Sequence, residues 1–392
     1  MIYVNAVSAL SSLGCGPDET LANLALGRAP GMRLTKGFLT RGRAVWLGHF
    51  TKPLPPMPGG FPREESRNNR ALRAAWEGCP GFARLLRSTP RDGVAVVLGT
   101  STSGSDEADR YVSSVVRAMP GEQRRPFAAE CQELGDPSRF LSAWLGTEGP
   151  AYTVSTACTS SIRAVISGAK LIESGLAQAA IVGGADTLAR LPVNGFSSLG
   201  ALSPGLCAPF SAGRDGITIG EGAALLWLSR EPSPVALLGF GESSDAHHMT
   251  APDPAGSGAC EAMRSALESA GLSGRDLSYV NLHGTGTPLN DAMEAAATFK
   301  AVGDAPLCSS TKPLTGHTLG AAGALEAVLA VLLSSRGGLI PGQFAPGRVR
   351  DPELAGIRLP LRPQRVEPGP VLTSNFAFGG SNASLLFGAA DG

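Results

Sequence analysis

The chain has 392 residues, of which 43% are hydrophobic and 17% are charged, and its formal net charge is zero. This length exceeds one ordinary hydrophobic core, so we expect two structural halves or one large α/β unit. The balanced charge provides no global field that would draw the protein to nucleic acid or to a membrane surface. Seven cysteines without C-x-x-C spacing argue against a disulfide framework or a zinc ribbon, and for a reducing compartment.

Two further features of the sequence bear on localisation. No basic segment precedes an apolar run at the start of the chain, so no signal peptide is expected. The longest apolar runs, such as residues 327–333, are shorter than a helix that spans a bilayer. The sequence therefore predicts a soluble cytoplasmic enzyme with no membrane partner.

Short apolar strands alternate with helical stretches along the chain. In chain order we predict a strand at 93–99, a helix at 161–174, strands at 179–184, 223–228 and 235–240, a helix at 258–270, a strand at 279–282, a helix at 320–334, and strands at 371–373 and 383–387. This alternation is typical of an α/β fold whose central sheets are covered by helices. A turn near 229–235 is the predicted boundary between the halves, although no internal repeat is legible.

Residues 154–161, V-S-T-A-C-T-S-S, place Cys158 among small residues between a strand and a helix that begins near Ser160. A helix start presents unpaired N–H groups and the positive end of the helix dipole. Both favour the thiolate, which is the nucleophilic form of cysteine. The alternative is that Cys158 is a small buried hydrophobe.

Two histidines lie in similar surroundings. His283 is in the segment N-L-H-G-T-G-T-P, and His317 is in the segment S-T-K-P-L-T-G-H-T-L-G. Both segments are predicted strand-to-helix junctions, where active sites of α/β sheets usually lie. Either histidine alone could be a structural hydrogen-bonding residue. Three such junctions that carry Cys, His and His together indicate a catalytic site.

These segments resemble the motifs of the β-ketoacyl-acyl carrier protein synthases of the elongating type. Cys158 stands where the family has its nucleophile, and His283 and His317 match its paired histidines. Lys312 and Glu326 match the lysine before and the glutamate after the second histidine. Residues 374–382, S-N-F-A-F-G-G-S-N, match the closing element of the family, and residues 210–222 match its R-D-G and G-E-G element.

The resemblance implies a thiolase-like α/β fold, with two similar halves in a layered αβαβα arrangement. Residues 1–232 would form the half that carries the nucleophilic Cys158, and residues 233–392 the half that carries His283 and His317. It also implies a dimer in which the sheets of both subunits continue across the interface. A homodimer and a heterodimer with a related ketosynthase remain open.

The implied reaction is a decarboxylative Claisen condensation. Cys158 would accept an acyl group from an acyl carrier protein, and a malonyl thioester on the same kind of carrier would then extend it by two carbons. The substrates would be carried on phosphopantetheine, so no other cofactor and no metal are expected. Nucleic acid is not an expected partner.

The resemblance also implies a role for each matched residue. The backbone N–H groups of Cys158 and Phe378 would form an oxyanion hole, and Phe378 would be a mobile gate. His283 and His317 would donate from Nε2 as neutral imidazoles. Lys312 would organise these histidines, with Glu326 in the same hydrogen-bond network. The helix start would lower the pKa of Cys158, so that no dedicated base need touch it.

Four further residues would contact or admit the substrate. Thr285 and Thr287 resemble the residues that hydrogen-bond the pantetheine arm, although they could be ordinary loop hydroxyls. Gly379 and Gly380 would let the backbone come close to the substrate without a clash from a Cβ atom.

A docking surface for the carrier is a further hypothesis. Arg63, Arg67 and Arg70 fall on one face of a predicted helix that follows a Pro- and Gly-rich loop at 53–62. Family members use basic residues here and at the positions of Arg124 and Arg125. The alternative is a solvated face whose charge is diluted by the neighbouring glutamates.

The chain also departs from the family pattern. Ser211 replaces the usual Asp, Ile217 the usual Phe, and Ala377 the first Gly of the gate loop, which predicts a stiffer loop. Residues 99–105 are rich in hydroxyl groups for a region that lines the acyl pocket in the family. These departures suggest a divergent enzyme of a specialised pathway, such as one that builds polyenes.

Other readings stay open at this point. A chain-length factor or a decarboxylase of this fold replaces the nucleophile with Gln, and the intact Cys158 argues against both. A thiolase or an initiating synthase is the next option, but the initiating type pairs Cys with one His and an Asn, whereas this chain has two His. A zinc protein is disfavoured because the Cys and His residues lack ligand spacing. A scaffold or chain-length-determining partner subunit remains the main alternative to a catalytic role.

Overall fold

The computed structural model describes residues 1–117 and 127–390. The first half of the chain contributes five strands to the central sheet, in the order β1-β9-β7-β5-β6. These are β1 (Ile2–Ser11), β9 (Gly222–Ser229), β7 (Ala179–Asp186), β5 (Val94–Gly99) and β6 (Ala151–Val154). β9 is antiparallel to both β1 and β7, whereas β7, β5 and β6 run parallel.

The second half repeats this arrangement. Its strands, in the order β10-β16-β15-β11-β12, are β10 (Val235–Ser244), β16 (Ser381–Ala389), β15 (Val371–Ala377), β11 (Tyr279–Asn281) and β12 (Leu307–Ser309). β16 is antiparallel to both of its neighbours, and β15, β11 and β12 run parallel. The two sets join where β1 pairs with β10 through Ile2–Leu237 and Tyr3–Ala236. The matching order and directions make the two halves similar, although the sequence shows no repeat.

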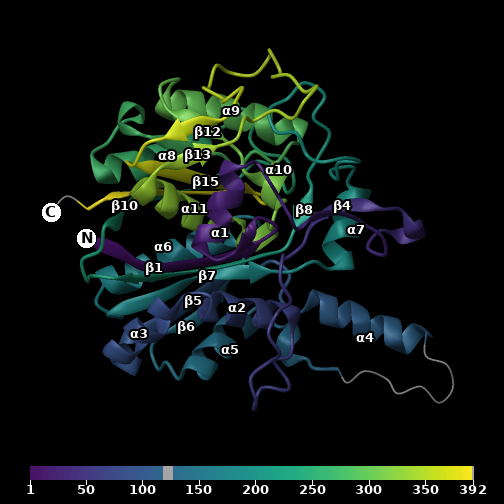
Figure 1. Cartoon of the computed structure of the whole chain (residues 1–392), viewed down its shortest axis with the longest axis vertical. Helices are drawn as coiled ribbons and strands as arrows, with labels where there is room; N and C mark the ends of the chain where they lie inside the picture. The colour runs from purple at the N-terminus through teal and green to yellow at the C-terminus, as the bar shows by residue number, and fades with distance from the viewer. Residues whose placement is uncertain (118–126, 391–392) are drawn as a thin grey trace.

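Helices form three layers around these strands. α2 (Arg67–Glu77), α3 (Pro80–Ser88) and α5 (Asp136–Leu145) lie on the outer side of the first set, and α8 (Ser257–Ala270) and α9 (Pro288–Val302) lie on the outer side of the second. α6 (Ser160–Glu173) and α11 (Ala322–Arg336) lie between the two sets (Figure 1). The order of layers is therefore αβαβα.

Smaller elements complete the described part of the chain. β2 (Gly14–Cys15) pairs with β1, and β3 (Met32–Thr35), β4 (Val45–Gly48) and β8 (Ile219–Gly220) form a separate sheet. β13 (Gly338–Ile340) pairs with β14 (Gln364–Val366). The remaining helices are α1 (Pro17–Ala25), α4 (Ser105–Arg117), α7 (Arg190–Ser198) and α10 (Lys312–Thr315).

Helix α11 is the central core helix, and apart from Glu326 and its C-terminal turn it consists of apolar and small residues. Its buried face contacts both sets of strands and α6. With the preceding turn, residues Leu319–Arg336 are long and apolar enough to cross a membrane, so the expectation that every apolar run is too short was wrong. However, 89% of this stretch is buried inside the protein, as in the core helix of a globular fold.

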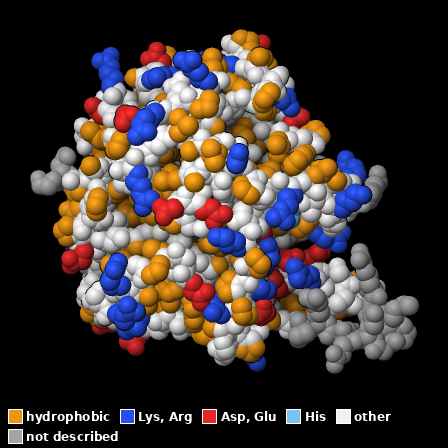
Figure 2. Space-filling model, viewed as in Figure 1, with side chains coloured by type: hydrophobic (Ala, Val, Ile, Leu, Met, Phe, Trp, Pro, Cys, Tyr) orange, Lys and Arg blue, Asp and Glu red, His pale blue; other side chains and the backbone are white. Residues whose placement is uncertain are grey.

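The surface agrees with the zero net charge. Lys and Arg side chains are interspersed with Asp and Glu over the face shown in Figure 2. No large area of a single sign is visible on that face, so long-range electrostatic steering has little basis there.

Candidate active site

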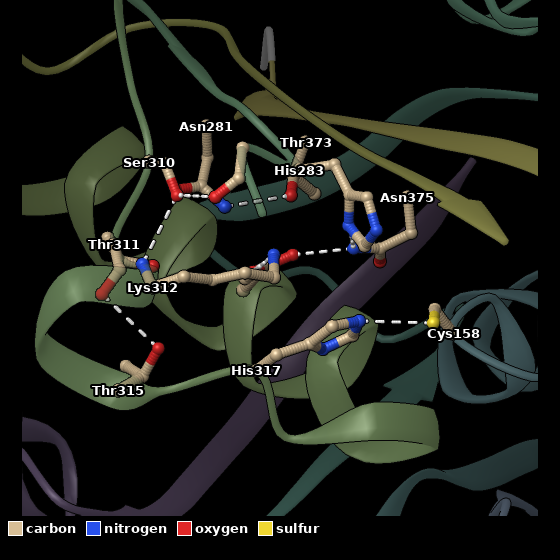
Figure 3. Close-up of polar contacts among 12 residues, drawn as sticks. Cys158, Asn281, His283, Ser310, Thr311, Lys312, Thr315, His317, Thr373 and Asn375 are labelled. Atoms are coloured by element: carbon tan, nitrogen blue, oxygen red, sulfur yellow. Dashed lines mark hydrogen bonds and ion pairs between the residues drawn. The ribbon is translucent and has the colours of Figure 1, made fainter. Parts of the chain in front are cut away.

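Cys158, His283 and His317 come together between the two halves of the fold (Figure 3). Cys158 follows β6, His283 follows β11, and His317 follows the short helix α10. The sulfur of Cys158 and one ring nitrogen of each histidine all lie within 4.8 Å of one another. Cys158 is more than a hundred residues from either histidine in the chain, so distant segments supply one site.

The chain turns sharply at Cys158. Ala157 adopts a φ of 52°, in the left-handed region that a residue with a Cβ atom rarely occupies. Helix α6 begins two residues later at Ser160, so Cys158 lies just before the start of that helix. This position is the one that the sequence predicted for it.

Burial dominates the ionisation of Cys158. The side chain is buried, and desolvation raises the pKa of its thiol to about 12, although the nearby charge of Lys312 acts in the opposite direction. The prediction that the helix start would lower this pKa is therefore wrong for the unliganded protein. The thiol form predominates at neutral pH.

This pKa predicts the pH dependence of alkylation. Well below the pKa, the thiolate fraction of Cys158 rises about tenfold per pH unit, and so does its reaction rate with iodoacetamide. We expect the rate to keep rising from pH 7 to 9 without a plateau. Mass spectrometry of the peptide that contains Cys158 measures this rate. The Cys158→Ala variant serves as the control, because any alkylation that it shows occurs at other residues. A plateau below pH 8 would contradict the raised pKa.

His317 is held as a hydrogen-bond donor towards Cys158. The backbone N–H of Leu319 donates to Nδ1 of His317 over 3.2 Å, so a neutral His317 carries its proton on Nε2. That Nε2 lies 3.1 Å from the sulfur of Cys158. His317 thus touches the nucleophile, but in this tautomer it donates to the sulfur rather than taking its proton, so it does not act as a base towards Cys158.

His283 is held as a donor by a chain of buried side chains. The amide nitrogen of Asn375 lies 2.9 Å from Nδ1 of His283 and 2.7 Å from Oε2 of Glu326, so it donates to both. The proton of neutral His283 is then on Nε2. The other oxygen of Glu326 accepts from Nζ of Lys312 at 2.5 Å. Lys312 and Glu326 therefore position His283 through Asn375, to which the sequence analysis assigned no role.

Both imidazoles are neutral at neutral pH. Burial lowers the pKa of His283 and of His317 well below the usual value for histidine, and the charge of Lys312 lowers each further. Their rings lie 5.2 Å apart between centroids in an edge-to-face arrangement. The site therefore offers two neutral N–H donors beside one sulfur.

The backbone of the His283 loop is fixed by a second carboxylate. Glu294 on α9 accepts the N–H groups of His283 and Gly284, each over 2.6 Å. Burial raises the pKa of Glu294 to about 8. Glu294 acts as a positioning residue that the sequence analysis did not single out.

Two cavities meet at Cys158. The larger has a volume of about 330 Å³ and is lined by His283, His317, Thr285 and Thr287, among others. The smaller, of about 270 Å³, includes Ser101, Thr102 and Ser105 of the hydroxyl-rich loop. Thr285 and Thr287, the expected pantetheine contacts, both line the larger cavity, and their hydroxyl oxygens lie 3.1 Å apart.

Phe378 stands between these cavities. Phe378, Phe196 and Cys158 line both, and the two phenyl rings lie 5.7 Å apart between centroids. Gly379 and Gly380 follow with φ of 85° and 76°, values that strain any residue with a Cβ atom. Ala377 is the last residue of β15 and has no positive φ, so this departure from the family costs no backbone strain.

The hydroxyl groups of residues 99–105 have a structural explanation. Buried Asp186 accepts hydrogen bonds from the hydroxyls of Thr100 and Thr102 and from the backbone N–H groups of Ser101 and Thr102. It also accepts the N–H of Gly320, in the segment that follows His317. One carboxylate thus joins the loop of the smaller cavity to the His317 segment.

The predicted arginine surface is largely engaged within the protein. Arg67 forms a two-pronged ion pair with Glu221, at 2.8 and 2.6 Å, and Glu221 is fully buried. Arg70 donates to the carbonyl groups of Leu54 and Pro55. Arg67 and Arg70 therefore make structural contacts within the protein, and their contact with a carrier stays a prediction.

The other docking candidates differ from these two. Arg63 is exposed and pairs with Glu130 at 2.8 Å. Arg124 and Arg125 lie outside the described residues.

The structure brings together the three potential zinc ligands that sequence spacing had discounted. A metal ligand needs a free lone pair on its nitrogen. The Nδ1 atoms of both histidines already accept hydrogen bonds, which leaves the protons on the Nε2 atoms. The arrangement therefore suits donation to a substrate oxygen better than coordination of a metal.

A layered αβαβα fold with Cys, His and His in one cavity defines an acyl-transferring enzyme of the thiolase-like class. The family model of the β-ketoacyl synthase N-terminal domain matches residues 69–233, and that of the β-ketoacyl synthase C-terminal domain matches residues 235–344. The chain belongs to the β-ketoacyl synthase family.

Individual relatives agree with this assignment. A 3-oxoacyl-[acyl-carrier-protein] synthase 2 of Staphylococcus aureus is 35% identical over 334 residues, which cover 81% of this chain and 82% of the relative. A solved chain from the complex of the ketosynthase ApeO with its chain length factor ApeC, from Xenorhabdus doucetiae, is 50% identical, with a TM-score of 0.96 and coverage of 99% and 98%. A chain of the ishigamide ketosynthase/chain length factor is 28% identical, with a TM-score of 0.88 and coverage of 100% and 99%.

Proposed function

We propose that the protein is a β-ketoacyl-acyl carrier protein synthase that extends an acyl chain by decarboxylative condensation with a malonyl thioester. The observation that carries this proposal is the pair of neutral imidazoles beside Cys158, each held with its proton on Nε2 by a partner at Nδ1. Two fixed donors suit an enolate oxygen, which gains negative charge during the reaction. An acyltransferase activity follows from this geometry.

In the first half-reaction, the sulfur of Cys158 attacks the acyl thioester of the carrier. The C–S bond to Cys158 forms, the C–S bond to the pantetheine sulfur breaks, and the thiol proton ends on the departing pantetheine thiol. The N–H groups of Cys158 and Phe378 face the reacting carbonyl as the oxyanion hole. Neither donates to another backbone group within residues 1–117 and 127–390.

In the second half-reaction, the malonyl group loses carbon dioxide, and the electron pair of that C–C bond forms the enolate. His283 and His317 donate to the enolate oxygen, and Thr285 and Thr287 hold the pantetheine arm. The enolate carbon attacks the acyl carbonyl on Cys158, whose sulfur leaves and takes up a proton. Side chains and thioesters supply every reacting group, so the reaction uses no further cofactor.

The arrangement of halves and subunits also belongs to this proposal. Residues 1–232 form the half that carries Cys158, and residues 233–392 the half that carries both histidines, with the division in the turn between β9 and β10. Strand β6 ends the sheet order and exposes Tyr152, so it is suited to pair with the same strand of a second subunit. The enzyme acts in the cytoplasm on carrier-bound substrates.

Intact-protein mass spectrometry with a panel of acyl-carrier thioesters tests the proposal. We expect an acyl adduct on the wild type and none on Cys158→Ala, followed by a β-ketoacyl product when malonyl-carrier is added. The preferred adduct reports the acyl class, including whether it is a polyene. Absence of any adduct would overturn the stand-alone condensing role.

A second candidate is a partner subunit in a ketosynthase heterodimer. Two of the structural relatives are complexes of a ketosynthase with a chain length factor, which favours this possibility. Cys158→Ala separates the two roles when the complex with a related subunit is assayed. If the variant still forms the complex and the complex still makes product, the chain is the scaffold. If the variant forms the complex but the complex makes no product, the chain is the catalytic subunit.

A further inference from the structure

Two residues beside the reactive groups have strained backbone conformations. Ala157, with a φ of 52°, directly precedes Cys158. Leu319 also has a φ of 52°, and its N–H is the group that donates to Nδ1 of His317. A residue with a Cβ atom keeps such a conformation only where the surrounding structure holds it. Whatever holds these two turns therefore also fixes the contact between His317 and the sulfur of Cys158 (Figure 3).

The carboxylate of Asp186 is connected to both turns. Asp186 is the last residue of β7 and is fully buried. Its Oδ2 accepts the N–H of Gly320, the residue after Leu319, over 2.6 Å. Its two oxygens also accept the N–H of Ser101, over 3.0 and 2.9 Å, and the hydroxyl of Ser101 donates to the carbonyl of Ala157 over 3.1 Å. Asp186 is thus one hydrogen bond from the Leu319 turn and two from the Ala157 turn.

Every hydrogen-bond partner of Asp186 is a neutral donor. These partners are the N–H groups of Ser101, Thr102 and Gly320 and the hydroxyl groups of Thr100 and Thr102. A carboxylate can accept from all of them through its two oxygens. An amide of the same shape must instead turn an N–H group towards a donor. The cluster is therefore built for a carboxylate.

Gly320 makes room for this contact. A Cβ atom at position 320 would lie 2.7 Å from Oδ2 of Asp186 and 2.6 Å from Oγ of Ser101, closer than real Cβ atoms approach. Gly320 has no positive φ, so its backbone conformation is open to alanine and only the close approach requires glycine. A methyl group at this position therefore disturbs the cluster without removing the carboxylate.

We propose that Asp186 is a positioning residue that holds the turns at Ala157 and Leu319 and thereby sets the tautomer of His317. If the Leu319 turn relaxes, its N–H no longer holds Nδ1, and a proton on Nδ1 competes with the proton on Nε2. The inference rests on the proposed function, because the Nε2 proton is the one that the enolate needs. Thr285 and Thr287 lie on another segment, so binding of the pantetheine arm is unaffected.

Asp186→Asn and Gly320→Ala test the proposal in the full-length enzyme. The first replaces an acceptor of the Gly320 N–H, and the second keeps the carboxylate but crowds it. Each is expected to lower kcat by about 10- to 100-fold through displacement of the imidazole, with the KM for malonyl-carrier unchanged. Asp136→Asn is the matched control, because Asp136 is also buried, at 1% exposure, but begins α5 on the outer side of the sheet. It should leave kcat unchanged.

Nitrogen NMR of histidine-labelled protein measures the tautomer directly and needs no turnover. The wild type should carry the proton of His317 on Nε2. Asp186→Asn and Gly320→Ala should show a mixture with the Nδ1 form, whereas Asp136→Asn should not. The signal of His317 is identified among the five histidines by its loss in His317→Gln. A side chain that only supports folding would not change this readout in folded protein.

The outcomes separate the positioning role from the proposed function. A wild-type His317 with its proton on Nδ1, an unchanged tautomer in both variants, a change in KM alone, or an equal loss in Asp136→Asn would overturn the role of Asp186. A wild type that forms no β-ketoacyl product would overturn the proposed function. A tautomer that still shifts in Asp186→Asn and Gly320→Ala would then leave the positioning of His317 supported.

Discussion

Replacing His283 with alanine is expected to slow condensation by about 100- to 1,000-fold, which corresponds to about 2.7–4 kcal/mol. The substitution removes one of the two N–H donors that would stabilise the enolate. It leaves the contact between His317 and the sulfur of Cys158 in place. Acylation of Cys158 should therefore persist, and adduct formation and product formation are measured separately by mass spectrometry.

A second variant identifies the cause of this loss. His283→Asn retains an N–H donor and should lose less condensing activity than His283→Ala. Equal loss of acylation and condensation in His283→Ala would contradict a role confined to the second half-reaction.

Replacing Lys312 with methionine is expected to destabilise the protein by about 3–5 kcal/mol, because it leaves the buried carboxylate of Glu326 without its ionic partner. Chemical unfolding followed by circular dichroism measures this change. Burial raises the pKa of Glu326 in the folded state above its value in the unfolded state. Below the unfolded-state pKa the carboxyl group is protonated in both states and destabilises the fold least. This advantage is lost as the pH rises through the folded-state pKa. The destabilisation should therefore be smaller at acidic pH than at pH 8.

Two control variants make this prediction specific. Lys170→Met removes an exposed partner of Glu242 and should cost about 0–1 kcal/mol. Lys312→Met combined with Glu326→Leu removes both buried charges and should recover stability, but not activity, because Asn375 loses the carboxylate that orients it towards His283. Full recovery of activity in the double variant would contradict the positioning role.

Much of the site could be predicted from the sequence because Cys158 and His283 directly follow the ends of short strands, which is a local pattern. His317 was also expected at a strand-to-helix junction, but it lies between the short helix α10 and α11. The layered α/β fold follows from the alternation of short strands and helices. The family motifs then link these local signals to one reaction.

The rest depends on contacts that no local pattern reveals. Asn375 lies 92 residues from His283 and 49 from Glu326, so its role appears only when β15 lies beside α11. Arg67 seemed exposed because its buried partner, Glu221, is 154 residues away. The pKa of Cys158 depends on how deeply the packed halves bury it, which the helix start alone does not indicate.

The position of Asp186 limits how this enzyme can change during evolution. A single carboxylate holds both the loop that lines the smaller cavity and the segment that follows His317. A substitution that reshapes the cavity at Thr102 therefore also loosens the support of a reactive imidazole. New acyl preferences should arise more readily at Leu191 or Pro192, which line the same cavity from helix α7. On the wall that α7 forms, the acyl preference can thus change without an effect on catalysis. On the wall that the Asp186-bound loop forms, a change in acyl preference also affects catalysis.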